Sequence, residues 1–202
     1  MNNHIPSARS GITVVIPTIP ARPACLVQAQ FSAWQNTLRP DGFSVALDVA
    51  AEGAAPTRNR ALMNVRASES PWVAFLDDDD EMMPEHLEKL ARHAEETGAD
   101  FVYSWFEMIG GKDPFPETHF TNEFDPENPI ETTITTLVRT ELAQEVGFHR
   151  LEERQFNSGE DYNFVLGCVK AGANIKHLVD RTWYYNVHGD NTGGLPWDWR
   201  KV

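Results

Sequence analysis

Residues 72–90 read WVAFLDDDDEMMPEHLEKL and combine an apolar run, an acidic turn and the start of a helix. The run 72–76 is continuously apolar, which is typical of a parallel strand that is buried on both faces. A helix is predicted over 84–98, because Pro84 suits its first turn and Gly98 suits its end. The stretch therefore predicts one strand–helix unit of an α/β protein, with the four aspartates 77–80 at the carboxyl end of the strand.

Further strands and helices alternate on both sides of this unit. Strands are predicted over 12–16, 43–49, 101–106, 175–179 and 182–187, and helices over 22–38, 57–68, 140–147 and 159–172. This alternation predicts an α/β fold with a mainly parallel, Rossmann-like sheet flanked by helices. In the first helix the apolar side chains that recur at helical spacing are expected to face the core: Val27, Phe31, Trp34 and Leu38. Residues 107–133 are expected to form a long loop of the kind that serves as a lid or a binding loop.

The composition is that of an ordinary globular protein with an acidic surface. The 202 residues suit one domain, and the formal net charge is -13. Such a charge disfavours a nucleic-acid partner but does not exclude one, and it suits a protein that holds an anionic ligand through bound cations. Residues 1–10 are expected to form a polar tail and 194–202 a C-terminal tail. The sequence does not determine the oligomeric state.

The two cysteines, Cys25 and Cys168, match no zinc-binding spacing. Both fall on apolar helical stripes, so buried reduced thiols are favoured over a disulfide. No apolar run approaches the about 18 residues that a membrane span needs, and the N-terminus has no signal-peptide core. These features predict a cytoplasmic protein without a membrane span.

The aspartate run can be interpreted in several ways. Ligands of open α/β sheets bind beyond the carboxyl ends of the strands, and clustered carboxylates there favour a hard cation such as Mg²⁺, Mn²⁺ or Ca²⁺. The structural alternative is a solvated turn whose last acids stabilise the N-terminus of the next helix. An EF-hand loop that began at Asp77 would need a glycine where Met82 stands. A phosphatase motif of the Asp-x-Asp-x-Thr type is disfavoured, because its fifth position is Glu81.

Several separated stretches resemble family-2-like glycosyltransferases with the GT-A fold. They are ITVVIPTIPAR (12–22), APTRNRAL (55–62), the aspartate stretch itself, VRTELAQEVGFHRL (138–151), SGEDYNFVLGCVKAGANIKHL (158–178) and WYYNVHGDNTG (183–193). Each stretch is a weak signal alone, but together they occur in the family's order along nearly the whole chain. The resemblance implies a minimal, single GT-A domain over 11–193.

The resemblance also implies an activity. Such enzymes move a sugar from a nucleotide-diphosphate donor, here of the UDP- or GDP-sugar type, to an acceptor hydroxyl, and the acceptor is unknown. It implies a divalent cation, Mn²⁺ or Mg²⁺, with Asp79 as the first candidate ligand, Asp77 as the second, and His188 near the metal or the diphosphate. Asp77 or Asp78 is expected nearer the donor ribose, and Asp80 is expected to have a mainly structural role at the start of the next helix.

An inverting transfer needs a base for the acceptor proton, and the resemblance assigns this role to Asp161, with Glu160 as the reserve candidate. The structural alternative is that both acids stabilise a helix start behind Ser158. The remaining donor-binding candidates are Pro17 and Thr18 after the first strand, Asp48 after the second, and Arg58 with Asn59 at a helix start. Arg58 could equally be a surface arginine. Trp105 and Glu107 could face the acceptor.

The sequence departs from the family where the nucleobase is expected. The family usually has Asp-Asp-Gly-Ser after its second strand, whereas this chain has ALDVAAEGAAP (46–56), in which only Asp48 and Glu52 are acidic. Two other functions therefore stay open. One is a degenerate GT-A domain that binds a cation or a sugar without turnover. The other is a sugar-nucleotide nucleotidyltransferase, although the Gly-rich signature expected after its first strand is missing.

Overall fold

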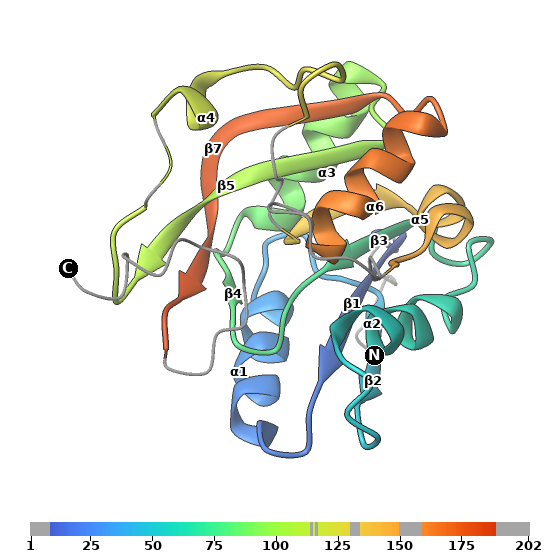
Figure 1. Ribbon diagram of the computed structural model, residues 1–202, viewed down its shortest axis with the longest axis vertical. Coiled ribbons are helices and arrows are strands. Elements are labelled where there is room, and N and C mark those ends of the chain that lie inside the picture. Colours follow the sequence, from blue (N-terminus) through green and yellow to red (C-terminus); the bar gives the residue numbers. More distant parts are fainter. Residues whose placement is uncertain (1–8, 114, 116, 130–133, 150–158, 189–202) are drawn as a thin grey trace, which may run out of the picture.

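The computed structural model describes residues 9–113, 115, 117–129, 134–149 and 159–188 as a seven-stranded sheet flanked by helices (Figure 1). The strands run in the order β2-β1-β3-β6-β5-β7-β4. Their bounds are Ile12–Thr18 (β1), Gly42–Leu47 (β2), Trp72–Phe75 (β3), Glu81–Met82 (β4), Phe101–Ile109 (β5), Thr136–Arg139 (β6) and Ile175–Asn186 (β7). The tails expected over 1–10 and 194–202 lie almost entirely outside the described residues.

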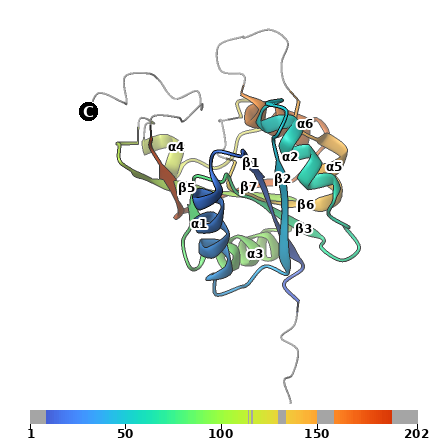
Figure 2. The same ribbon diagram turned by 90° about the horizontal axis from the view of Figure 1, so that it is seen from below.

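Helices cover both faces of the sheet, as the view from below shows (Figure 2). One face carries α1 (Pro23–Trp34) and α3 (His86–Thr97), and its core contains Ile16, Leu76 and Leu90. The other face carries α2 (Ala54–Met63), α5 (Thr140–Val146) and α6 (Glu160–Lys170) over a core that includes Phe75. A short helix, α4 (Glu117–Thr121), lies beside β7. Among the described residues no helix is long and apolar enough to cross a membrane.

The α/β class is confirmed, and most of the paired residues of the sheet lie in parallel pairings, as predicted. Three strand pairings are parallel and three are antiparallel. The antiparallel pairings all involve β6 or β4. These strands are four and two residues long, and the sequence analysis did not identify them. The two strands predicted over 175–179 and 182–187 form the single strand β7, whose pairing with β5 shifts register between Ser104 and Phe106. The segment expected as a loop after 106 contains the end of β5 and all of α4.

The prediction for the inward face of α1 was wrong. Val27, Phe31 and Trp34 are 64%, 59% and 46% exposed, whereas Ala29 and Ala33 are fully buried. Leu38 is partly buried, as expected. The helix presents its alanines to the sheet, and small residues allow helix and sheet to approach closely. The same rotation leaves Cys25 exposed, against expectation, whereas Cys168 is buried and both thiols are free, as predicted.

Gly167 lets α6 pack closely against α5. A Cβ atom at this position would lie 2.3 Å from Cγ1 of Val146, which is far inside van der Waals contact. Alanine is the better helix former by about 1 kcal/mol, but overpacking of this kind costs about 1–3 kcal/mol. We expect Gly167→Ala to lower the free energy of unfolding in urea, and Val146→Ala in the same chain to restore part of the loss. An unchanged or higher stability of Gly167→Ala would contradict this packing.

His86 links α3 to β7 and β5 through a buried polar network. Its Nδ1 lies 2.6 Å from Thr182 Oγ1, which lies 2.6 Å from Ser104 Oγ, and all three residues are buried. Burial lowers the pKa of His86 from 6.5 to about 3, so the folded protein holds the ring neutral.

The lowered pKa of His86 makes stability depend on pH. Below pH 6.5 the unfolded chain takes up a proton that the folded chain does not, so stability falls as the pH drops from 6.5 towards 3. Between pH 7 and pH 4.5 the contribution is about 2–3 kcal/mol. Urea unfolding at both pH values should show this loss in the parent and in the exposed-site control His149→Asn, but a smaller loss in His86→Leu. Equal losses of stability in the parent, His149→Asn and His86→Leu would refute the role of His86 in this pH dependence.

Candidate functional site

The aspartate run lies at the carboxyl end of β3, as the sequence predicted. Leu76 is fully buried after the strand, and Asp77 to Asp80 form the turn that leads into β4. β1 pairs in parallel with β3 on one side and with β2 on the other. Thr18 is the last residue of β1 and Asp48 follows β2, so both lie at the carboxyl edge of the sheet. Pro17 lies in β1, opposite Ala46 of β2. Polar side chains from several loops therefore meet at one edge.

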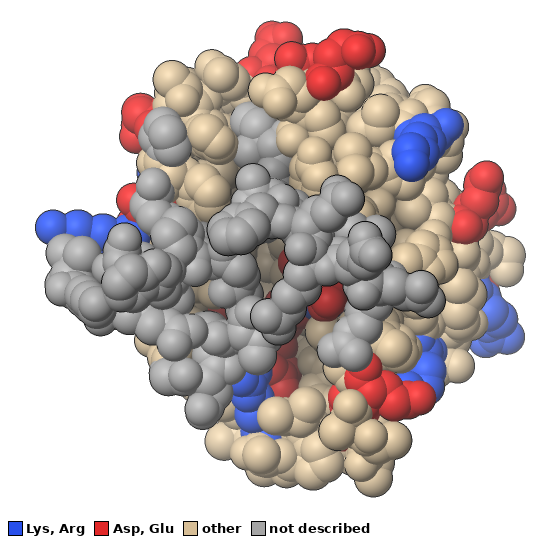
Figure 3. Space-filling model, in the orientation of Figure 1, with Lys and Arg blue, Asp and Glu red and all other residues tan. Residues whose placement is uncertain are grey.

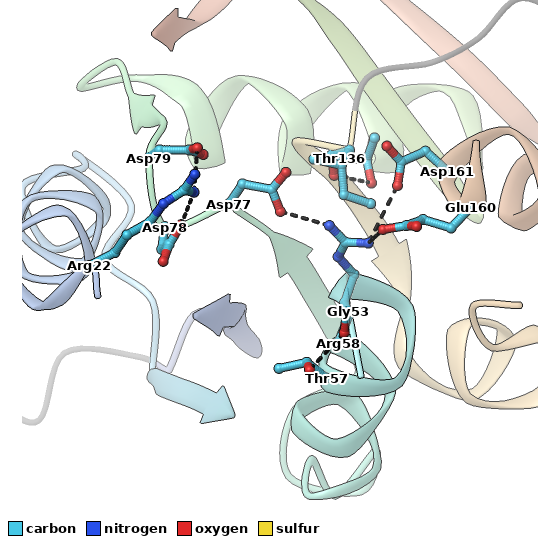
Figure 4. Close-up of polar contacts among 11 residues, drawn as sticks. Arg22, Gly53, Thr57, Arg58, Asp77, Asp78, Asp79, Thr136, Glu160 and Asp161 are labelled. Atoms are coloured by element: carbon cyan, nitrogen blue, oxygen red, sulfur yellow. Dashed lines mark hydrogen bonds and ion pairs between the residues drawn. The ribbon is translucent and has the colours of Figure 1, made fainter. Parts of the chain in front are cut away.

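Asp78 faces the loop that connects β1 to α1. Thr18 Oγ1 donates to Asp78 Oδ2 at 2.7 Å. Arg22 Nη1 donates to Asp78 Oδ1 at 3.1 Å and to Asp79 Oδ2 at 2.7 Å, so one guanidinium bridges two successive aspartates (Figure 4). Burial alone would lower the pKa of Arg22, but Asp79 and Asp78 raise it. The sequence analysis missed Arg22, although a cation in the turn after the first strand of such a sheet is a usable signal.

Asp79 and Asp80 extend the site towards the end of β7. His188 Nε2 lies 2.9 Å from Asp79 Oδ2, so the histidine predicted near the metal does lie beside an aspartate. Asp80 Oδ1 accepts the backbone N–H of Asn186 at 3.0 Å. Burial and the neighbouring aspartates raise the pKa of both carboxyls, and the effect is larger for Asp80. Asp80 thereby fixes the turn to β7 and does not lie at the start of the next helix, where its structural role was expected, because β4 stands between Asp80 and α3.

Three of the four aspartates could hold a cation together. One carboxylate oxygen each from Asp77, Asp79 and Asp80 lies within 4.8 Å of the others. Oxygen donors of this kind suit a hard divalent cation such as Mg²⁺ or Mn²⁺. Burial and, after it, the charges of neighbouring aspartates raise the pKa of Asp79 and Asp80, and a divalent cation bound between the carboxylates would favour their charged forms. Asp78 points instead to Thr18 and Arg22.

Arg58 extends from α2 into a ring of carboxylates and is only 2% exposed. Its Nη2 donates to Asp77 Oδ1 at 2.7 Å, and its Nη1 donates to Glu160 Oε1 at 3.2 Å and to Asp161 Oδ1 at 3.4 Å. Burial would lower the pKa of Arg58, but the charges of Asp77, Asp161 and Glu160 outweigh it and raise the pKa. Its guanidinium also lies over the ring of Phe148, 4.9 Å from the centroid.

Glu160 and Asp161 form the first turn of α6, where the sequence placed them. Gly159 occupies the N-cap position and provides no side-chain cap, while Ser158, the expected cap, lies outside the described residues. The two acidic side chains are 24% and 39% exposed. They therefore face Arg58 on one side and remain reachable from solvent, which suits groups that exchange protons with a bound molecule.

Two predicted donor-binding residues make mainly backbone contacts. Asn59 Nδ2 donates to the Phe148 carbonyl oxygen at 2.7 Å, and its Oδ1 accepts the Phe148 N–H at 2.8 Å. Asp48 accepts the N–H groups of Glu52 and Gly53 at 2.9 and 2.7 Å, and these bonds lower its pKa. Both side chains thus shape loops at the edge of the site.

Trp105 and Glu107, the acceptor-side candidates, lie in β5. Trp105 is buried and donates from Nε1 to Asp113 at 2.6 Å, whereas Glu107 is exposed. In the space-filling view, a few acidic side chains are visible near the centre of the face (Figure 3). A depression of about 1010 Å³ lies by Arg39, Phe43 and Ser70, and none of the site carboxylates lines it.

The sheet, its helices and the aspartate turn define the class of the protein, a GT-A fold. Solved structures of S. aureus TarS support this class. The structure of TarS 1–349 with UDP has a TM-score of 0.67 and 20% identity, covering 87% of this chain and 60% of that chain. The structure with UDP-GlcNAc has a TM-score of 0.70 and 19% identity, covering 89% and 59%. The chain therefore spans about three fifths of these TarS chains.

The family follows from the sequence itself. Residues 28–155, more than half of the chain, match Glycosyl transferase family 2. The protein therefore belongs to glycosyl transferase family 2, and the resemblance drawn from its motifs is confirmed. A search of curated proteins gave no match.

Proposed function

We propose that the protein is a metal-dependent glycosyltransferase that moves a sugar from a nucleotide-diphosphate donor to an acceptor hydroxyl with inversion at the anomeric carbon. One observation carries the proposal. A single buried guanidinium, that of Arg58, contacts both the aspartate turn through Asp77 and the pair Glu160–Asp161. A group that could face the donor diphosphate and a group that could take the acceptor proton therefore lie on either side of one side chain.

The donor would bind at the edge formed by β1, β2 and β3, within the single domain proposed over 11–193. UDP and UDP-GlcNAc occupy the similar fold of TarS, which favours a UDP-sugar over a GDP-sugar as the first donor to test. Thr18, Asp78 and Arg22 would lie beside the ribose and the diphosphate, and Asp48 and Asn59 would support the loops around them. Arg22 adds a positive charge that the sequence analysis did not assign to the donor.

The chemistry follows from the two sides of the site. The acceptor oxygen attacks the anomeric carbon, and the Asp161 carboxylate takes the proton of the attacking hydroxyl. The bond from the anomeric carbon to the diphosphate oxygen breaks, and its electron pair leaves with the diphosphate. Because attack and departure occur on opposite faces of the sugar, the configuration inverts. A divalent cation held by Asp79, Asp77 and His188, with Asp80 as the third carboxylate of the cluster, would supply positive charge beside the leaving diphosphate.

A donor panel tests the proposal. The protein is incubated with UDP- and GDP-sugars, with Mn²⁺ or Mg²⁺ and with a chelator, and release of nucleoside diphosphate is measured. Release that requires the cation supports the proposal. Binding of a sugar nucleotide without any release favours a domain that binds without turnover. A nucleotidyltransferase would instead release inorganic pyrophosphate from a nucleoside triphosphate and a sugar phosphate.

A further inference from the structure

Arg58 differs from every other described arginine in how little of it reaches the solvent. Its side chain is 2% exposed, while the other arginines in ion pairs, Arg22, Arg60, Arg66 and Arg181, are 21–74% exposed. A buried arginine whose N–H groups point at carboxylates has little surface left for a ligand. Its environment therefore indicates a role that is exerted through its neighbours.

The guanidinium divides its contacts between two parts of the site (Figure 4). Nη2 is directed to Asp77, which follows β3, and Nη1 is directed to Glu160 and Asp161, which begin α6. The planar fork of an arginine fixes the relative directions of its N–H groups, whereas an ammonium group does not. The distance between the aspartate turn and the α6 acids is therefore set by one rigid group.

Other residues hold that group in place. The ring of Phe148 packs on the guanidinium. Asn59, the next residue in α2, donates one hydrogen bond to the Phe148 backbone and accepts another from it, and these bonds fix that backbone. Phe148 also stacks on Phe164 of α6 with centroids 4.2 Å apart. Phe164 lies one helical turn beyond Asp161. The same aromatic contact thus orients Arg58 and the helix that carries the acids.

We propose that Arg58 is a positioning residue that fixes the distance and orientation of Asp161 relative to the donor-side aspartate Asp77. The inference rests on the proposed function, because it takes Asp161 as the base and Asp77 as part of the donor site. It assigns to Arg58 an action through two carboxylates rather than contact with the donor. Misplacement of a catalytic group by about 1 Å lowers a rate by about 100-fold, so loss of the fork acts on turnover more than on binding.

Arg58→Lys tests this role because it keeps the charge and removes the fork. The probe is UDP-N-acetylglucosamine, or the sugar nucleotide that the donor panel selects, with release of nucleoside diphosphate as the signal. We expect kcat to fall about 100-fold, while the dissociation constant of the donor, measured by calorimetry, changes less than about threefold. Arg66→Lys is the matched control, since Arg66 lies just past α2 in an exposed pair with Glu69, and its kinetics should equal those of the parent.

A double variant separates positioning from other roles. If Arg58 acts through Asp161, adding Arg58→Lys to Asp161→Asn lowers the residual rate, followed with a radiolabelled donor, by less than about threefold. A fall as large as in the parent background would overturn the inference, as would a raised donor KM with kcat unchanged, which would make Arg58 a donor contact. Both outcomes leave the proposed function standing. Absence of release from the parent chain with any donor would instead overturn the proposed function and, with it, this inference.

Discussion

Replacing Asp161 with asparagine is expected to slow the release of nucleoside diphosphate by about 10²–10⁴-fold, the usual contribution of a general base. Asparagine has nearly the same shape as aspartate but cannot take a proton. Arg58 keeps Asp77 and Glu160 as partners, so the ring of contacts around it survives. The donor should therefore still bind, with a dissociation constant close to that of the parent chain. Steady-state kinetics and calorimetry with the same sugar nucleotide measure the two effects.

The neighbouring acids provide the controls for this prediction. Glu160→Gln removes the other carboxylate that contacts Arg58 Nη1 and should cost much less activity than Asp161→Asn. Glu141→Gln changes an acid in the first turn of another helix, α5, and should leave the rate unchanged. Full turnover in Asp161→Asn would show that Asp161 is not the base. A larger loss in Glu160→Gln would transfer the role to Glu160.

The sequence predicted the structure well wherever that structure depends on residues that are close together in the chain. The strand 72–76, its aspartates and the helix after them are contiguous in the chain, and their apolar pattern and end signals predicted them closely. The strands β4 and β6 are too short to show a period, and they exist because β7, β3 and β5 offer them hydrogen-bonding edges. The prediction of the inward face of α1 was wrong because the helix has two apolar stripes, one of large side chains and one with Ala29 and Ala33. Tertiary packing alone decides that the alanines face the sheet.

The site shows the same division between local and distant determinants. Thr18, the aspartates, Arg58 and the α6 acids were predicted to share one site, and the structure brings them together through contacts of 2.7–3.4 Å. The sequence could not predict which side chains of the site contact one another. That Arg22 bridges Asp78 and Asp79, and that Asn59 holds a backbone segment, depends on residues 56–89 positions apart. No local pattern encodes contacts of this range.

Replacing Asp79 with alanine is expected to remove the dependence of the reaction on a divalent cation together with most of the activity. Asp79 contributes to the carboxylate cluster, accepts from Arg22 and lies beside His188, so its loss withdraws a cation ligand from the leaving-group side. Stabilisation of developing charge by one such group is worth about 10²–10³ in rate. We expect release of nucleoside diphosphate in saturating Mn²⁺ to fall by at least about 10²-fold, and a chelator to have little further effect.

Asp80 and Asp180 distinguish loss of a cation ligand from loss of structure. Asp80→Ala removes the buried side chain that accepts the Asn186 N–H, so it should lower the thermal midpoint as well as the activity. Asp79→Ala removes a side chain nearer the surface and should unfold close to the parent temperature. Asp180→Ala changes an exposed acid paired with Lys89 and should leave the Mn²⁺ dependence intact. If Asp79→Ala instead kept the parent's rate and its response to Mn²⁺, the cation would have to bind elsewhere, because the remaining carboxylates Asp77 and Asp80 could not restore a three-carboxylate cluster.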